Sequence, residues 1–199
     1  MSQICLVRHG ETDWNAMGKI QGRTDIPLNS IGKRQARECG EHLACSHWDR
    51  VITSPLKRAK QTAEIINKSR QLPLIEMEEF VERCYGEAEG MSKDERLDKF
   101  PNGHIPKQEE RFVLNERVMH GLEKIQQRYP NDKIILVAHG AVINTILAIF
   151  SDGKIGSGKT KLVNACISHL HFLENQWRIK EYNQVHHLSQ FNEIKEGMK

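Results

Sequence analysis

Two histidine-glycine pairs stand directly after short apolar segments, where polar side chains could do chemistry on a bound ligand. The first lies in Arg8-His9-Gly10 and the second is His139-Gly140. A third polar segment, which contains Arg58, begins a helical pattern after another apolar segment. Because open α/β sheets bind ligands at the carboxyl ends of their parallel strands, we expect these side chains to meet at one sheet edge.

The charges of these residues indicate what such an edge could bind. Two imidazoles, two guanidinium groups and nearby helix N-termini form a cationic pocket that suits a tetrahedral dianion. No paired carboxylates accompany these residues in the sequence to hold a metal ion. The pattern therefore predicts a phosphate-type anion site without a metal.

The elements that must position these residues follow from the apolar periodicity. Segments 4–7 and 133–138 are rich in β-branched residues, as buried parallel strands are. We expect further strands at 51–53 and at 72–75, the latter at a sheet edge because of its proline. Helical patterns cover 30–45 with Asn29 as N-cap, a segment capped by Ser54 with Pro55 in its first position, 108–129, and 141–150.

The order of these elements predicts the fold class. Segments 167–173 and 177–182 flank a short polar turn and indicate a β-hairpin. We expect a three-layer α/β/α sandwich with a mostly parallel sheet, one antiparallel C-terminal hairpin and a lid inserted over the sheet edge. The lid is the polar, glycine- and proline-containing stretch 80–107, within an excursion of about 80–130 from a single domain spanning 1–199.

Composition excludes several classes of protein. The chain has 199 residues, of which 38% are hydrophobic and 28% charged, as in an ordinary globular domain. A net charge of +3 is too balanced for a dedicated nucleic-acid binder. The most apolar stretch, 141–150, is too short to span a membrane, and the first residues lack the basic start of a signal peptide. We therefore expect a cytoplasmic protein, with five reduced cysteines and no nucleic-acid or membrane partner.

The motifs together resemble the histidine phosphatase superfamily, also called phosphoglycerate mutase-like. The resemblance covers nearly the whole chain, so the fold and activity of that family are expected here. The motifs are L-V-R-H-G-E-T-D-W-N at 6–15, Q-G-R-T-D-I-P-L-N at 21–29, S-P-L-K-R-A-K-Q-T-A at 54–63, E-R and Y-G-E-A-E-G within 82–90, and V-A-H-G at 137–140.

The resemblance implies a role for each site residue in the hydrolysis of a small phosphomonoester without a cofactor. His9 would attack phosphorus and become a phosphohistidine that water then hydrolyses. Arg8, Arg58 and His139 would stabilise the charge of the transferring phosphoryl group. Glu82 would be the general acid that protonates the leaving oxygen. Asn15, Gln21 and Gly22 match positions that line the phosphate pocket.

The sequence departs from the family pattern in and next to the lid. The usual family motif Arg-Glu-Arg-Asn/Asp is replaced here by Glu82-Arg83-Cys84-Tyr85. The usual motif Pro-Gly-Gly-Glu-Ser is absent at 106–110. Glu11, Glu87 and Glu89 are rival carboxylates to Glu82. The identity of the substrate is therefore the feature that the sequence predicts least.

Three other functions compete with phosphomonoester hydrolysis. The nearest alternative is a bisphosphoglycerate-dependent phosphoglycerate mutase of the same superfamily. The resemblance implies a longer chain with a lid insertion for such mutases, and this chain is short for that. Residues 153–160 match the P-loop pattern G-x-x-x-x-G-K-T, yet they follow a helical pattern where a P-loop needs a strand. A sensor without turnover is disfavoured by the intact set of arginines and histidines. His169 and His171 share a strand face, but no carboxylate cluster joins them as metal ligands.

Overall fold

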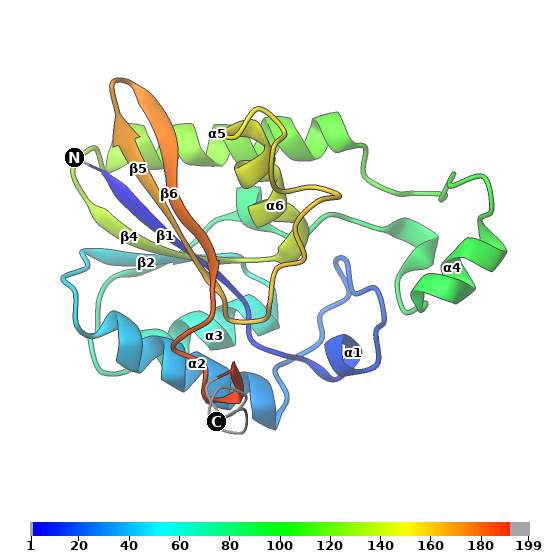
Figure 1. Ribbon diagram of the computed structural model, residues 1–199, viewed down its shortest axis with the longest axis horizontal. Helices are drawn as coiled ribbons and strands as arrows, with labels where there is room; N and C mark the ends of the chain where they lie inside the picture. Colours follow the sequence, from blue (N-terminus) through cyan, green and yellow to red (C-terminus); the bar gives the residue numbers. More distant parts are fainter. Residues whose placement is uncertain (1, 192–199) are drawn as a thin grey trace, which may run out of the picture.

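A mixed six-stranded sheet forms the centre of the computed structural model, which describes residues 2–191 (Figure 1). Its strand order is β3-β2-β4-β1-β5-β6, with parallel pairing from β3 to β1 and antiparallel pairing of β5 with β1 and β6. The strands are β1 (Gln3–Arg8), β2 (Arg50–Thr53), β3 (Leu74–Glu76), β4 (Lys133–Ala138), β5 (Ile167–Leu173) and β6 (Gln176–Gln184). The predicted parallel sheet, edge strand and C-terminal hairpin are confirmed.

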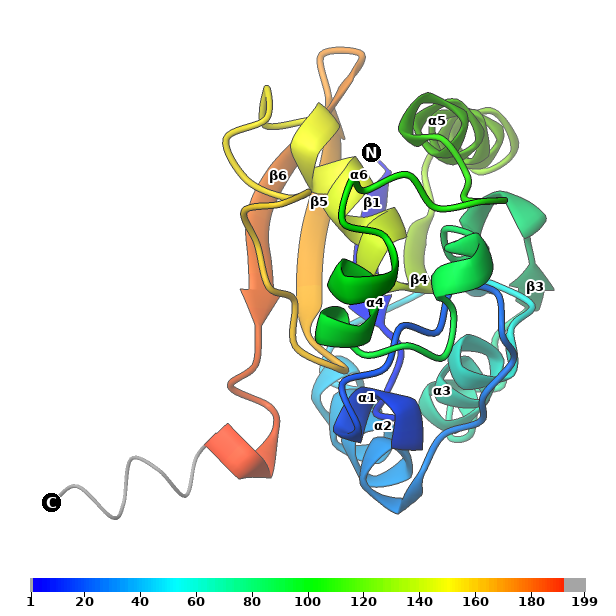
Figure 2. The ribbon, with the colours of Figure 1, turned by 90° about the vertical axis from the view of Figure 1, so that its right-hand side faces the viewer.

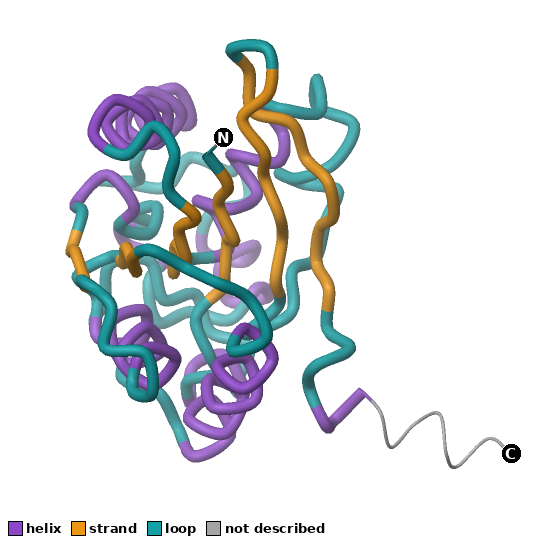
Figure 3. Tube along the Cα trace, turned by 90° about the vertical axis from the view of Figure 1, so that its left-hand side faces the viewer, coloured by secondary structure: helices purple, strands orange, loops and turns teal. Residues whose placement is uncertain are grey.

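Helices cover both faces of this sheet (Figure 3). One face packs against α5 and α6 and the other against α2 and α3, as the two separate core clusters show. The predicted three-layer sandwich is therefore confirmed. The helices are α1 (Asp13–Ala16), α2 (Ser30–Leu43), α3 (Lys57–Asn67), α4 (Lys93–Lys99), α5 (Arg111–Arg128) and α6 (Gly140–Ile149), with 3-10 turns η1 (Glu78–Phe80), η2 (Gly86–Ala88) and η3 (Ser189–Phe191).

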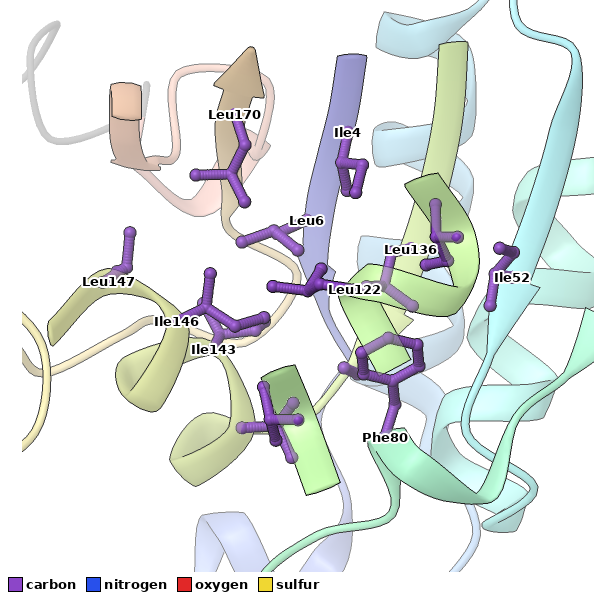
Figure 4. Packing of buried hydrophobic residues seen from close by; sticks show 14 of the residues in the cluster. Ile4, Leu6, Ile52, Phe80, Leu122, Leu136, Ile143, Ile146, Leu147 and Leu170 are labelled. Atoms are coloured by element: carbon purple, nitrogen blue, oxygen red, sulfur yellow. The ribbon is translucent and has the colours of Figure 1, made fainter. Parts of the chain in front are cut away.

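The two cores follow from the alternation of side chains along buried strands. In β1, Ile4 and Leu6 point into the core beneath α5 and α6, whereas Cys5 and Val7 point into the core above α2 and α3. Figure 4 shows the first of these clusters, in which Phe80 from the edge of the lid packs among strand and helix residues. Because both faces of β1 and β4 are buried, the loops at their carboxyl ends have a rigid support.

Helix starts show where the sequence predicted correctly and where it did not. Asn29 caps α2 as expected, and its side chain accepts a hydrogen bond from Gly32 N. The prediction that Ser54 caps the next helix is wrong, because α3 begins at Lys57 with no cap from its own N-cap side chain. Asp25, from a distant loop, accepts the hydrogen bond of Lys57 N instead, at 2.7 Å.

The lid crosses the carboxyl edge of the sheet, and α4 lies in front of that edge between α1 and α5 in Figure 2. Glu89 fastens the lid to a loop near the site, since its carboxylate accepts hydrogen bonds from Arg23 N, Thr24 N, Thr24 Oγ1 and Tyr85 N at 2.6–3.0 Å. Beyond the lid, α5 packs against α6 and the sheet, with Leu114 and Val118 buried. Of the excursion of about 80–130, only the lid (80–107) lies over the site, because α5 packs on the sheet as one of its covering helices.

The P-loop-like segment 153–160 lies in irregular turns that follow α6 and lead toward β5. A P-loop joins a strand to a following helix, which is the opposite order. The nucleotide-binding alternative therefore has no structural support in this segment. No helix within residues 2–191 is long and apolar enough to cross a membrane.

Candidate active site

A cavity of about 550 Å³ opens at the carboxyl ends of β1 and β4, where the sequence predicts the site. Of the residues predicted for the site, seven line it: Arg8, His9, Asn15, Gln21, Gly22, Arg58 and Glu82. The eighth, His139, lies beside His9 with 5.2 Å between the ring centroids. The structure therefore brings together residues from β1, α1, α3, the lid and the start of α6.

His9 is buried, with 2% of its surface exposed, and its protonation state is set by its surroundings. The Nδ1 atom lies 2.7 Å from the carbonyl oxygen of Gly10, so this nitrogen carries the proton and donates it to that carbonyl. Burial, together with the charges of Arg58 and Arg8, lowers the pKa of His9 well below its ordinary value. At neutral pH the ring is uncharged, and Nε2 keeps the lone pair that a nucleophile needs.

A close backbone approach holds the loop that follows His9. A Cβ atom on Gly10 would lie 2.5 Å from the carbonyl oxygen of Gly32 in the first turn of α2, so only glycine fits there. The backbone N–H of Gly10 donates to Thr62 Oγ1 at 3.0 Å. The loop that follows His9 is thereby held against α2 and α3.

Arg8 and Arg58 each use part of the guanidinium group to hold the protein and leave part of it unpaired. Arg58, with 0% exposure, donates to the carbonyl oxygens of Thr24 at 2.9 Å and Gly22 at 2.7 Å. Arg8 donates through Nη1 to Leu162 O at 2.5 Å. The Nε atoms of both arginines are buried without a hydrogen-bond partner in the protein. Buried donors require acceptors, and a bound oxyanion would provide them.

His139 completes this set of donors. Its Nε2 atom lies 2.8 Å from Ser54 Oγ, while Nδ1 is buried without a partner. A neutral ring that accepts the Ser54 hydroxyl proton at Nε2 carries its own proton at Nδ1 and can donate it to a ligand. Burial and the nearby Arg58 lower the pKa of His139 well below its ordinary value. Ser54 thus positions His139, a role that its position in the sequence did not reveal.

Two further residues missed in the sequence, Thr12 and Asn164, orient the amide side chains of the pocket. The buried Thr12 Oγ1 lies 3.1 Å from Asn15 Oδ1 and 2.9 Å from Gln21 Oε1. Asn164 Nδ2 contacts Asn15 Oδ1 at 3.2 Å and His9 O at 3.1 Å. Because the oxygens of both amides are engaged, their NH₂ groups remain for a ligand. The T-x-x-N spacing of a capping box at 12–15 was the signal that could have identified Thr12.

Glu82 is the carboxylate that faces the pocket. Its two oxygens accept hydrogen bonds from the backbone N–H groups of Arg83 at 2.9 Å and Ala141 at 3.2 Å, the latter in the first turn of α6. The rival carboxylates are engaged elsewhere, because Glu11 accepts from Asn29 Nδ2 and Glu87 lies near Lys107. Glu89 is held by the lid contacts described above. Glu82 therefore has the geometry that fits a general acid.

The remaining histidines lie away from this cavity. His42, His186 and His187 form a small cluster of rings, with His187 Nε2 lying 3.0 Å from the carbonyl oxygen of Ala165. His169 and His171 are half-buried in β5. Over residues 2–191, no group of three or more His, Cys, Asp or Glu side chains is arranged to hold a metal ion.

Comparison with known proteins gives the family. Residues 4–185 match the histidine phosphatase superfamily (branch 1). A Bacillus subtilis protein named as the uncharacterized phosphatase PhoE is 53% identical over 96% of this chain and 99% of its own length. The metal-independent phosphoserine phosphatase of Arabidopsis thaliana is 34% identical over 99% of this chain and 87% of its own length. The chain therefore belongs to the histidine phosphatase superfamily.

Solved structures agree with the fold. YhfR of Bacillus stearothermophilus superposes with a TM-score of 0.88 at 24% identity, covering 94% of this chain and 99% of that one. Phosphoserine phosphatase of Entamoeba histolytica, solved with 3-phosphoglyceric acid, superposes with a TM-score of 0.83 at 28% identity, covering 94% and 100% of the two chains. Within the superfamily, the chain is a phosphatase.

Proposed function

We propose that the protein hydrolyses small phosphomonoesters through a phosphohistidine at His9, without a metal ion. The observation that carries this proposal is the state of His9: a neutral, buried imidazole whose protonated Nδ1 is held by Gly10, which leaves Nε2 as the nucleophile. Three donor groups around this ring, Arg8, Arg58 and His139, would stabilise the charge on the phosphoryl oxygens, so no metal is needed for that purpose.

The reaction proceeds in two displacements. In the first, His9 Nε2 attacks phosphorus, the N–P bond forms, and the P–O bond to the alcohol breaks while Glu82 donates a proton to the leaving oxygen. In the second, Glu82 takes a proton from water, the water oxygen attacks phosphorus, and the N–P bond breaks to return His9 and release inorganic phosphate. Arg8, Arg58 and His139 hold the phosphoryl oxygens through both steps.

Relatives support the substrate class and the place of action. Proteins of similar sequence are named phosphoserine phosphatases, and one was solved with 3-phosphoglyceric acid. We propose that this protein likewise takes a small phosphorylated metabolite, in the cytoplasm. The pocket volume of about 550 Å³ accommodates such a molecule.

The test is to trap the phosphoenzyme. The wild-type protein mixed with radiolabelled substrate and quenched should carry an acid-labile label that is stable to alkali, and His9→Ala should lose both this label and turnover. Activity should survive EDTA. Label on a serine or cysteine, or loss of activity with EDTA, would overturn the mechanism. Faster isomerisation of 3-phosphoglycerate, with catalytic bisphosphoglycerate, than phosphate release would instead indicate a mutase.

A further inference from the structure

The peptide group between Gly10 and Glu11 forms a hydrogen bond at each of its two ends. Its carbonyl oxygen belongs to Gly10 and lies 2.7 Å from Nδ1 of His9. Its N–H belongs to Glu11 and donates to Oε1 of the Gln35 side chain at 2.9 Å. Because a trans peptide group is planar, with its C=O and N–H pointing in opposite directions, the direction of one hydrogen bond fixes that of the other. Gln35 is therefore connected to His9 through one rigid unit.

Gln35 lies in α2, directly behind the loop that follows His9. Its side chain is buried, with 2% exposed, and it follows Gly32 by one helical turn. A Cβ atom on Gly32 would lie 2.6 Å from the backbone nitrogen of Glu11, so the helix and the peptide group are in direct contact. Gln35 does not belong to the described residues that line the cavity. Any effect of Gln35 on the reaction must therefore act through the loop.

The C-terminal part of the described chain fixes the direction of the Gln35 amide. Segment 185–191 lies beside α2 in Figure 1, and its Leu188 is fully buried. Within this segment, Oε1 of Gln190 accepts a hydrogen bond from Nε2 of Gln35 at 3.2 Å. The oxygen of the Gln35 amide must then face the N–H of Glu11, because the reverse orientation would bring two N–H donors together. Each atom of this amide thus has one partner that suits it.

This series of hydrogen bonds favours the tautomer of His9 that can attack phosphorus. A neutral imidazole carries one N–H, and the other nitrogen keeps the lone pair. The carbonyl oxygen of Gly10 holds the proton on Nδ1 as long as it points at that nitrogen. Hydrogen bonds in series polarise one another, so the bond from the peptide N–H to Gln35 makes this carbonyl a stronger acceptor. Without the Gln35 oxygen, the peptide group can turn and the proton can move to Nε2, where it blocks attack.

We propose that Gln35 is a positioning residue, which holds the peptide group between Gly10 and Glu11 so that His9 presents the lone pair of Nε2 to phosphorus. Gln190 supports this role because it orients the Gln35 amide. This inference rests on the proposed function, in which His9 is the nucleophile. The donors that hold the phosphoryl group are not part of this series of contacts. Loss of Gln35 should therefore lower the rate of phosphoryl transfer and leave phosphate affinity nearly unchanged.

Single-turnover kinetics test this difference between rate and affinity. Gln35→Met keeps the length of the side chain and removes both hydrogen bonds, so phosphoenzyme formation should slow about tenfold while the inhibition constant for inorganic phosphate changes less than about twofold. Gln35→Glu keeps an oxygen for the N–H of Glu11 and should recover most of the rate. Gln61→Met is the matched control, because Gln61 accepts a hydrogen bond of the same kind from Leu28 N at 2.9 Å, outside the peptide group that holds His9. This control should phosphorylate at the wild-type rate.

Variants of Gln190 test the same contacts without a change in the buried residue. Gln190 is half-buried and lies near the end of the described chain, so its replacement leaves α2 and the sheet intact. Gln190→Leu removes the acceptor that orients the Gln35 amide and should slow phosphoenzyme formation by about two- to fivefold. Gln190→Glu keeps an oxygen at this position and should retain the rate. Equal rates for the leucine and glutamate variants would contradict the supporting role of Gln190.

Nitrogen NMR of the imidazole reports the tautomer directly and does not depend on turnover. The chain has ten histidines, so the His9 signals are identified as those missing from His9→Ala. The wild-type protein should carry the proton of His9 on Nδ1, and Gln35→Met should shift it toward Nε2. An unchanged tautomer in Gln35→Met, or an equal loss of rate in Gln61→Met, would overturn the positioning role. A phosphoryl label on a residue other than His9 in the wild-type protein would instead contradict the proposed function.

Discussion

Replacement of Glu82 by glutamine should separate its chemical role from its structural one. Glu82 uses each carboxylate oxygen to accept one backbone N–H, from Arg83 and from Ala141. A glutamine at this position keeps one oxygen acceptor, so one of these hydrogen bonds is lost. Loss of a hydrogen bond of this kind costs about 1 kcal/mol, which corresponds to a change of roughly fivefold in a rate or binding constant that depends on the position of this side chain.

The chemical effect is larger and depends on the leaving group. General acid catalysis contributes about 10²- to 10⁴-fold when the departing alkoxide needs a proton. Nitrophenolate is stable without one, so its departure gains little from an acid. Glu82→Gln should therefore slow an alkyl phosphate by about 10²- to 10⁴-fold and p-nitrophenyl phosphate by no more than the structural factor of roughly fivefold.

The assay is steady-state release of phosphate from both substrates at one pH. Glu87→Gln makes the same chemical change at an exposed carboxylate next to Lys107 and is the matched control, which should behave as wild type. Arg58→Lys should slow both substrates comparably, because the phosphoryl group that it stabilises is common to them. If Glu82→Gln slows both substrates equally, or neither, the general acid is another residue.

Two further predictions follow from the hydrogen bonds and the buried histidines. Thr12→Val keeps the shape of the side chain but removes the hydroxyl that orients the amides of Asn15 and Gln21, so the inhibition constant for inorganic phosphate should rise about five- to tenfold. Thr12→Ser keeps a hydroxyl and should have an inhibition constant like that of the wild type. An unchanged constant for the valine variant would show that the hydroxyl has no positioning role. Burial lowers the pKa values of three histidines, namely His9, His139 and His187, and that of His187 falls to about 4. Below about pH 6.5 the unfolded chain therefore binds protons at these histidines, whereas the folded chain does not. Stability present above pH 6.5 should be lost as the pH falls, and Tm should drop by several degrees between pH 7 and 5, by about 2–4 °C per kcal/mol; His187→Gln should reduce the drop, and a constant Tm would contradict the assignment of neutral buried rings.

The features that sequence predicted well are those that depend on local pattern. β4 begins and ends where its apolar run does, since burial on both faces imposes a continuous apolar stretch. β5 also has its predicted bounds, which the polar turn after it helps to define. The capping of α2 by Asn29 is equally local. The prediction for Ser54 failed because its partner, His139, is 85 positions away in the sequence, and a hydroxyl suited to capping also suits an imidazole. Asn164 was missed for the same reason, since its contacts to His9 and Asn15 arise only when the chain folds.

The attachment of the lid through Glu89 has a consequence for the traffic of substrate and product. Glu89 holds the backbone of Thr24, and the carbonyl oxygen of Thr24 holds Arg58. A swinging movement of the lid would therefore displace Arg58, the arginine that we propose binds the phosphoryl group. We expect substrates to enter and alcohols to leave through a standing opening, with no gating step to limit the rate. The width of that opening then sets an upper size for the molecules that this enzyme can process.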